Sequence, residues 1–136
     1  MIDQLSIFAE NKKGTMRDIT RTLSEAGINI TALITNDSAE FGIVRMLVTD
    51  PELAARLLQA DGYLCRLDQV IGVNISDEPG SLAGLLTAIT DSNINVEYLY
   101  ISYDRAHATP IAILQAAGAW EVEDCLRSRG YDLLQK

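Results

Sequence analysis

The sequence contains two copies of one pattern, and this repeat constrains the fold more strongly than any other feature. Gly-Thr-Met at 14–16 recurs as Gly-Ser-Leu at 80–82, a spacing of 66 residues. At the same spacing, Gly-Ile-Asn-Ile at 27–30 recurs as Asn-Ile-Asn-Val at 93–96. Because the matches are colinear, each copy is expected to form the same small structural unit.

The copies differ in length by two residues. Gly-Tyr at 62–63 recurs as Gly-Tyr at 130–131, which is a spacing of 68 rather than 66 residues. The two additional residues therefore enter within 102–109, in the second copy. We expect two domains, at 1–68 and 69–136.

Each copy shows the same order of hydrophobic periodicities. Apolar residues alternate along 5–9 and 71–75, as in strands, and then follow a helical spacing along 16–26 and 82–89. The following strands are expected at 28–35 and 42–49 in copy one and at 94–102 and 111–116 in copy two, each pair joined by a turn (36–38) or a longer loop. A second helix and a short last strand complete each copy, with Gly62 and Gly130 ending the helices.

The order βαββαβ, present twice, predicts an α+β protein made of two ferredoxin-like units in tandem. Each unit would be an antiparallel sheet with its helices on one face. A single unit of about 65–70 residues is marginally stable, so pairing two of them is favourable. Between Gly62 and Asp77 there is no Pro- or Ser-rich linker, which favours a rigid pair.

Several residues are suited to the helix ends. Thr15 with Asp18 resembles a capping box, and Ser81 is expected to cap the equivalent helix. Asp50-Pro51 predicts an N-cap followed by proline at the first helical position. Gly27 is placed for a left-handed C-terminal residue, and Asn93 is an acceptable substitute for it.

Composition excludes some classes of function. The formal net charge is −8 and the sequence pI is about 4.5, which disfavours binding to nucleic acid or to an anionic membrane. No apolar run reaches the roughly 18–20 residues of a membrane span, and the N-terminus does not resemble a signal peptide. Cys65 and Cys125 form no CxxC pattern, so we expect a cytoplasmic protein without a disulfide framework or a zinc site.

The strand-to-helix loops at 11–16 and 77–82, together with the turns at 27–30 and 93–96, carry a family resemblance. The pattern "N/D-x-x/P-G-[ST]-[LM]…G/N-I-N-[IV]" resembles the ACT domain family, and the duplication is similar to its stand-alone tandem members. The resemblance implies a regulatory module that binds an amino acid and controls an enzyme. It also implies that the ligand lies between the first strand-to-helix loop of one unit and elements of its neighbour.

The chemistry of these residues suits an amino acid. Gly14 and Gly80 allow close backbone approach at helix starts whose first N–H groups can receive a carboxylate. Asn11 or Asp77 could receive the ammonium, Asn29 or Asn95 could bridge to it, and Met16 and Leu82 could contact the side chain. The predicted ligand-binding residues are Asn11, Gly14, Thr15, Met16, Asn29, Ile30, Asp77, Pro79, Gly80, Ser81, Leu82, Asn95 and Val96.

Plainer interpretations stay open for the same residues. The glycines suit any tight turn, and Asn29 and Asn95 could serve only as turn residues. Lys12 and Lys13 are typical of a solvated loop. Copy two has Glu78-Pro79 in their place, and its loop is nearer to the binding loops of the family.

Catalytic chemistry has little support in this sequence. His107 is the single histidine and is expected to be an exposed loop residue. Glu121, Glu123 and Asp124 suggest the solvent face of the last helix, whereas Trp120 suggests a core or interface anchor. No nucleotide-binding or hydrolase motif is present, so we expect no enzyme activity, cofactor or metal.

Apolar residues on the expected outward sheet positions predict a homodimer. Ile43 and Leu47 flank Arg45, and Ile111 and Ile113 precede Gln115. Tyr98, Tyr100 and Tyr103 either pack under the hairpin or form part of a pocket or interface.

Three functions are compatible with these observations. The leading hypothesis is a non-catalytic sensor that holds a free amino acid at the seam between units. The second is a small regulatory subunit that docks to a biosynthetic enzyme, such as one of branched-chain amino-acid synthesis. The third is an enzyme on a ferredoxin-like scaffold, which fold alone does not exclude.

Overall fold

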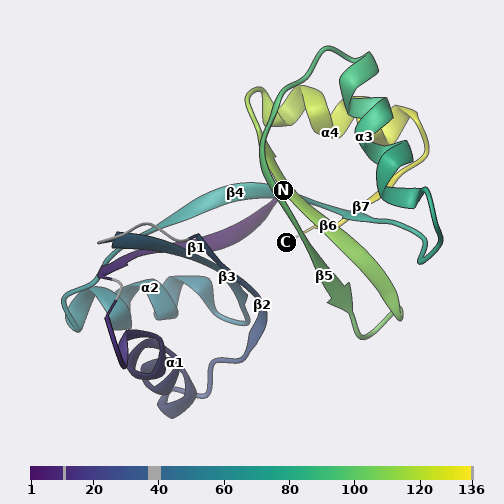
Figure 1. The fold of residues 1–136 in the computed structure, drawn as a ribbon. Coiled ribbons are helices and arrows are strands. Elements are labelled where there is room, and N and C mark those ends of the chain that lie inside the picture. Colours follow the sequence, from purple (N-terminus) through teal and green to yellow (C-terminus); the bar gives the residue numbers. More distant parts are fainter. Residues whose placement is uncertain (11, 37–40, 136) are drawn as a thin grey trace. The chain divides into compact units, whose positions relative to one another are not determined.

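The computed structural model describes residues 1–10, 12–36 and 41–135 (Figure 1). The predicted site residue Asn11 and positions 37 and 38 of the predicted turn lie outside the described residues. In chain order the elements are β1 (Ile2–Glu10), α1 (Thr15–Glu25), β2 (Ile30–Asn36), β3 (Phe41–Val48), α2 (Pro51–Ala60), β4 (Leu64–Asn74), α3 (Ser81–Asp91), β5 (Val96–Asp104), β6 (Thr109–Ala116), α4 (Ala119–Ser128) and β7 (Asp132–Leu133).

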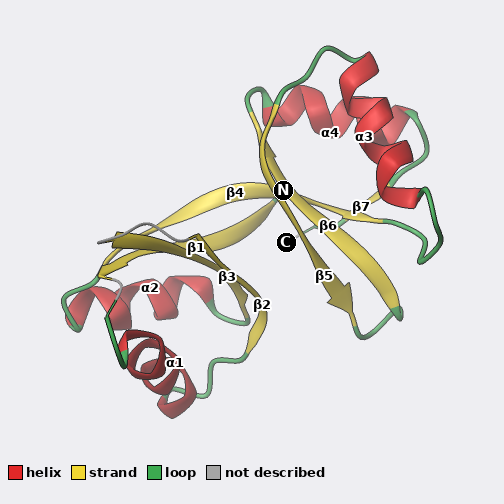
Figure 2. Cartoon of the chain, in the orientation of Figure 1, coloured by secondary structure: helices red, strands yellow, loops and turns green. Residues whose placement is uncertain are grey.

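The contacts within the chain define two units. The N-terminal unit is Asp3–Asp68, and the C-terminal unit is Gln69–Lys136 together with Met1–Ile2. The strand order is β2-β3-β1-β4 in the N-terminal unit and β5-β6-β4-β7 in the C-terminal unit. In both, the first strand lies between the last and the third. The predicted architecture of two ferredoxin-like units is thus confirmed, and in each unit both helices cover one side of the strands (Figure 2).

One strand, β4, is shared by the units. It is continuous over 11 residues and passes through the boundary at Asp68/Gln69. Within the C-terminal unit, Ile71–Asn74 pair with β6, and Val73 and Asn74 also pair with β7. The last strand of one copy and the first of the next are therefore a single element, which agrees with the absence of a linker in the sequence.

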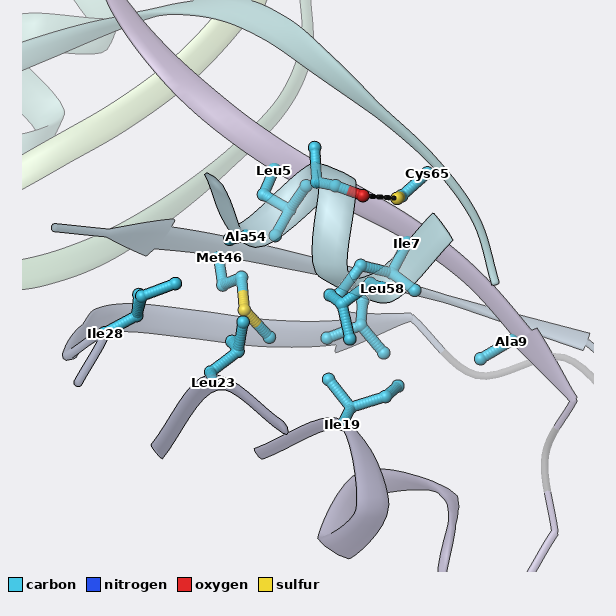
Figure 3. Packing of buried hydrophobic residues seen from close by; sticks show 12 residues of the cluster. Leu5, Ile7, Ala9, Ile19, Leu23, Ile28, Met46, Ala54, Leu58 and Cys65 are labelled. Carbon is cyan, nitrogen blue, oxygen red and sulfur yellow. Dashed lines mark hydrogen bonds between the residues drawn. The ribbon is translucent and has the colours of Figure 1, made fainter. Parts of the chain in front are cut away.

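Each unit has its own hydrophobic core between sheet and helices. In the N-terminal unit, Ile19 of α1 points toward Ile7 of β1 and Leu58 of α2, and Leu23 of α1 points toward Met46 of β3 (Figure 3). Alternation along β1 explains this arrangement, because a strand places every second side chain on the same face. Fully buried core residues are Leu5, Ile7, Ile19, Leu23, Met46 and Leu58 in the N-terminal unit and Ile71, Val73, Leu85, Leu114, Val122 and Leu126 in the C-terminal unit.

All four described helices end with a residue of positive φ. The N–H of the next residue donates to a carbonyl five positions earlier, as in a Schellman motif: Ile28 to Leu23 (2.9 Å), Tyr63 to Leu58 (3.0 Å), Ile94 to Ile89 (3.3 Å) and Tyr131 to Leu126 (3.1 Å). The φ of Gly27 is 73° and that of Asn93 is 58°, so the predicted substitution of asparagine for glycine is confirmed. No helix among the described residues is long and apolar enough to cross a membrane.

Candidate functional site

The loop between β1 and α1 turns at Gly14, which has φ 88° and occupies the N-cap position. The Thr15 N–H donates to the Lys12 carbonyl (3.2 Å), and the Asp18 N–H donates to the Gly14 carbonyl (2.9 Å). Thr15 already lies inside the helix, and no side chain caps it. The predicted capping box of Thr15 and Asp18 is therefore wrong, because a left-handed glycine holds the position that the threonine would need.

The loop between β4 and α3 repeats this geometry. Gly80 has φ 91° and is the N-cap, the Ser81 N–H donates to the Glu78 carbonyl (3.2 Å), and the Gly84 N–H donates to the Gly80 carbonyl (2.8 Å). Ser81 does not cap the helix as predicted. Its hydroxyl instead shares a hydrogen bond of 2.6 Å with the hydroxyl of Ser76.

Both helix starts expose backbone donors. Among the described residues, the N–H groups of Met16 and Arg17 have no acceptor, and neither do those of Leu82 and Ala83. Such groups attract an anion because they are unpaired and lie at the positive end of the helix dipole. The side chains of Met16 and Leu82 are only partly available, since each packs against the core of its unit.

The predicted residues of the helix-to-strand turns lie at the other end of these helices. Asn29 is exposed, and its backbone N–H donates to Thr49 Oγ1 (3.0 Å). A hollow of about 370 Å³ lies beside this turn, with Asn29 and Ile30 in its lining. Asn95 is likewise exposed, while Ile30 and Val96 pack partly against the cores.

The structure does not bring the two groups of predicted residues together within one unit. Gly14 precedes an 11-residue helix that begins at Thr15, and Asn29 and Ile30 follow this helix. At 1.5 Å per residue, α1 separates them by about 16 Å. The helix α3 also has 11 residues and separates the loop at 77–82 from Asn95 and Val96 in the same way.

A larger hollow, of about 480 Å³, lies at the first loop within the N-terminal unit. Of the residues that line it, only Thr15 is among the predicted ligand-binding residues. The residues that it missed come from β1, the loop and the α2–β4 turn, among them Phe8, Lys12, Lys13, Asp61, Tyr63 and Leu64. The sequence did contain one signal for these missed residues, the recurrence of Gly-Tyr at 62–63 and 130–131. This recurrence marked a second turn at the same edge of each unit.

The charges at this hollow are only partly paired. Lys12 Nζ lies 2.9 Å from Glu10 Oε2, and this hydrogen bond raises the pKa of Lys12. Asp61 Oδ2 accepts a hydrogen bond from Thr22 Oγ1 (2.7 Å). Lys13 is exposed and has no carboxylate within 4 Å among the described residues. Among the described residues that line it, the hollow therefore offers one cation without a carboxylate partner, together with carboxylates that can accept further donors.

The His107 loop forms the β5–β6 hairpin turn. His107 is exposed, and its Nδ1 lies 2.6 Å from Asp104 Oδ2. This hydrogen bond raises the pKa of His107 and lowers that of Asp104. The His107 side chain is 75% exposed, so the imidazole lies in solvent on the hairpin.

One further prediction requires correction. Glu123 is not on the solvent face of α4: it is 2% exposed and accepts a hydrogen bond from the Met1 amino group (3.0 Å). Trp120 was predicted to be a core or an interface anchor, and its exposure of 73% removes the first alternative and leaves the second. Burial raises the pKa of the Cys65 thiol, as expected for a core cysteine. Within the described ranges, no group of three or more potential ligands could hold a metal ion.

Comparison with known structures finds close matches over nearly the whole chain. A protein from Bacteroides thetaiotaomicron is 30% identical, with a TM-score of 0.90, and the match covers 97% of this chain and 90% of the other. The regulatory subunit of aspartate kinase from Thermus thermophilus, in its ligand-free form, is 17% identical, with a TM-score of 0.69 and coverages of 94% and 92%. The corresponding subunit from Thermus flavus is 18% identical, with a TM-score of 0.64 and coverages of 93% and 90%.

The two aspartate kinase subunits, at these identities, show a likeness of fold alone. None of the curated proteins matches the chain. The family model of the ACT domain pair matches residues 1–116, which include both strand-to-helix loops and both helix-to-strand turns. This match confirms the resemblance on which the site residues were predicted, and the chain belongs to the ACT domain pair family.

Proposed function

We propose that this protein is a non-catalytic regulatory sensor that binds a free amino acid between ACT units. The separation of loop and turn within each unit carries the proposal. Because a helix of about 16 Å lies between them, one small ligand cannot contact both within a unit. A site that uses both needs the loop of one unit and the turn of a neighbouring one.

The loop of the C-terminal unit has the groups that an amino acid requires. Asp77, Pro79 and Gly80 are exposed, and the amides of Leu82 and Ala83 have no acceptor among the described residues. These amides would receive the carboxylate, and the Asp77 carboxylate would receive the ammonium. Asn95 of a neighbouring unit, with both a donor and an acceptor, would bridge to the ligand.

The regulated partner in this proposal is a metabolic enzyme. Two proteins of similar fold are regulatory subunits of aspartate kinase, which supports a role outside catalysis for this chain as well. Ligand binding would favour one arrangement of the units, and the enzyme would respond to that arrangement. A cytoplasmic homodimer is part of the proposal, supported by the exposed apolar residues Leu33 on β2 and Ile101 on β5.

The same fold likeness favours a second candidate, a small regulatory subunit that acts by docking to a biosynthetic enzyme. In that case the essential surface would be the docking face rather than the ligand site. The two candidates differ in whether the isolated protein binds an amino acid.

A thermal-shift screen of the twenty amino acids on ligand-free protein tests the sensor proposal. We expect one or a few amino acids to raise the melting temperature, and Gly80→Asp to abolish that shift by placing a carboxylate at the site of the ligand's own. Gly80→Asn is the matched control, because asparagine has nearly the same size and also tolerates positive φ.

The outcomes separate the two candidates. Loss of the ligand shift in Gly80→Asp, with at least part of it kept in Gly80→Asn, supports the sensor. A shift unaffected by Gly80→Asp contradicts the site. A flat screen, with a dimer of wild-type protein in light scattering, favours the docking subunit.

A further inference from the structure

The helix α4 lies beside α3 on the strands of the C-terminal unit (Figure 2). Val122 and Leu126 of this helix are fully buried in the core of the unit. Trp120, Asp124 and Arg127 follow the spacing i, i+4, i+7, so they share a different side of the helix. All three are exposed, and we call them the α4 stripe.

The tryptophan of the α4 stripe is not required by the fold. Trp120 is 73% exposed, so a large apolar ring lies in water. The equivalent position of α2 is Glu52, which is also exposed. Because α2 and α4 have the same place in the two units, a charged residue satisfies the fold there equally well. An exposed tryptophan that the fold does not need is typical of an interface anchor.

Arg127, two turns after Trp120, is also available for a contact outside the chain. Its guanidinium lies 3.8 Å from Glu123 Oε2 and 3.8 Å from Asp124 Oδ1, and both distances exceed a hydrogen bond. A guanidinium packs favourably on the face of an indole ring. At 1.5 Å per residue, however, Trp120 and Arg127 are separated by about 10 Å along the helix, so they do not stack within one chain.

The order of these residues makes the α4 stripe complementary to a second copy of itself. In two antiparallel helices related by a two-fold axis beside Asp124, Trp120 of each copy faces Arg127 of the other. The acidic start of one helix, with Glu121 and Asp124, then lies along the basic end of the other. A parallel pair would instead place like charges opposite each other, which is unfavourable.

We propose that α4 is a self-association surface, on which Trp120 of one copy stacks against Arg127 of a second copy. The proposal rests on the proposed function only for the homodimer, and it uses a surface apart from the amino-acid site. One helix from each copy gives a contact smaller than the roughly 1,200–2,000 Å² of stable interfaces. We therefore expect an association that depends on protein concentration across the micromolar range.

Fluorescence and sedimentation equilibrium of the full chain test this contact directly. Trp120 is the single tryptophan of the chain, so the emission reports on the α4 stripe alone. We expect the emission maximum to move to shorter wavelength as the concentration and the mass rise, because the indole leaves water. Since the contact contains each residue twice, Trp120→Ala should raise the Kd of self-association by about a hundredfold, tenfold for each indole.

An exchange of the two residues tests the antiparallel pairing. Trp120→Arg alone places two guanidiniums opposite each other and should weaken the association at least as much as Trp120→Ala does. Adding Arg127→Trp restores the pair with its members exchanged, so the Kd should return to within about tenfold of wild type. Because positions 120 and 127 do not meet within one chain, such a recovery requires contact between copies.

Matched variants provide the controls. Arg129→Trp, added to Trp120→Arg, introduces the same side chain outside the α4 stripe and should not restore the association. Glu52→Ala, at the equivalent position of α2, should leave the Kd unchanged. All of these positions are exposed, so the fold is expected to persist, and far-UV circular dichroism of each variant checks this.

The proposal is overturned if Trp120→Ala associates as wild type does, or if Arg129→Trp restores the association as well as Arg127→Trp. A mass that rises with concentration while the Trp120 emission stays constant also overturns it, because the contact then lies elsewhere. Each of these results leaves the homodimer of the proposed function standing. A wild-type protein that stays monomeric overturns the α4 contact and the homodimer together, and the thermal-shift screen still decides whether the protein binds an amino acid.

Discussion

The two units share a backbone and differ in chemistry. Gly14 and Gly80 have φ values of 88° and 91°, and Gly62 and Gly130 have 95° and 87°. Between these fixed points, Lys12-Lys13 of the N-terminal unit stands against Glu78-Pro79 of the C-terminal unit. The residues that set the path of the chain correspond in the two units, whereas the side chains of the strand-to-helix loops differ.

The difference extends to the outward side of the strands. In the N-terminal unit, Ser6 is buried and donates to Asp68 (2.6 Å), which also accepts from Arg66 (2.9 Å). The equivalent of Ser6 in the C-terminal unit is Gly72, against which Leu134 packs. A polar network in one unit thus corresponds to a close apolar contact in the other.

The largest expected effect tests whether the cores are equivalent. Leu58 and Leu126 occupy the same position in α2 and α4, and both are 0% exposed. We expect Leu58→Ala and Leu126→Ala each to lower the free energy of unfolding by about 2–5 kcal/mol, because each leaves a cavity in a packed core. Urea denaturation measures the loss.

Hydrogen exchange then locates the effect. If the units are independently packed, Leu58→Ala accelerates amide exchange mainly in residues 3–68 and Leu126→Ala mainly in residues 69–135. Uniform acceleration by either variant would show that the cores do not act separately.

A smaller effect is expected at Gly72. A Cβ added there would lie 2.6 Å from Leu134 Cδ1 and 3.1 Å from Leu134 Cβ, so the side chain of Leu134 has to move. We expect Gly72→Ala to cost about 1–3 kcal/mol in urea denaturation, through overpacking. In a Leu134→Ala background the same change should cost clearly less, and an equal cost in both backgrounds would refute the contact as the cause.

The smallest effect concerns His107, in the loop that is two residues longer in the C-terminal unit. Its pKa should exceed the ordinary value of 6.5, chiefly because of the hydrogen bond with Asp104. The His107 contribution to stability is complete below its unfolded pKa and is lost as pH rises through the raised folded value. The Asp104 contribution is present above that group's ordinary pKa of 3.8 and is lost as pH falls through the lowered folded value.

NMR titration of the imidazole measures this pKa. Asp104→Asn should bring the His107 pKa back toward 6.5, and a wild-type value at or below 6.5 would contradict the pairing. Because both groups lie near the surface, the effect on global stability should be slight and should decrease with added salt.

The fold was predictable because periodicity and repetition supported each other. The alternation of apolar residues along β1 indicates a strand, and the helical spacing from Met16 to Leu23 indicates a helix. Because both periodicities recur in the second copy, each assignment had independent support. The caps were harder to predict. Asp50 accepts from the Leu53 N–H (3.2 Å) as expected, but Thr15 and Ser81 do not cap, because the preceding glycine determines where the helix begins.

The candidate site was only partly predictable for a different reason. Residues at 14–16 are close in sequence and carry a family pattern, whereas Asp61 and Leu64 meet them only after folding. Lys13 was predicted to lie in a solvated loop, and it is exposed; the sequence could not show that it also lines a hollow. Glu123 was misread because the carboxylate spacing on α4 does not show that a buried amino group lies opposite it.

The shared strand β4 limits how this protein can be divided into fragments. A cut between Asp68 and Gln69 divides one 11-residue strand, and it leaves Met1 and Ile2 covalently attached to the unit to which they do not belong. The C-terminal fragment loses Met1 and Ile2 of its own unit, and both fragments lose part of β4. The ACT pair is therefore the smallest piece of this chain that can be transplanted intact, and fusing it whole to another protein preserves what a single repeat would lose.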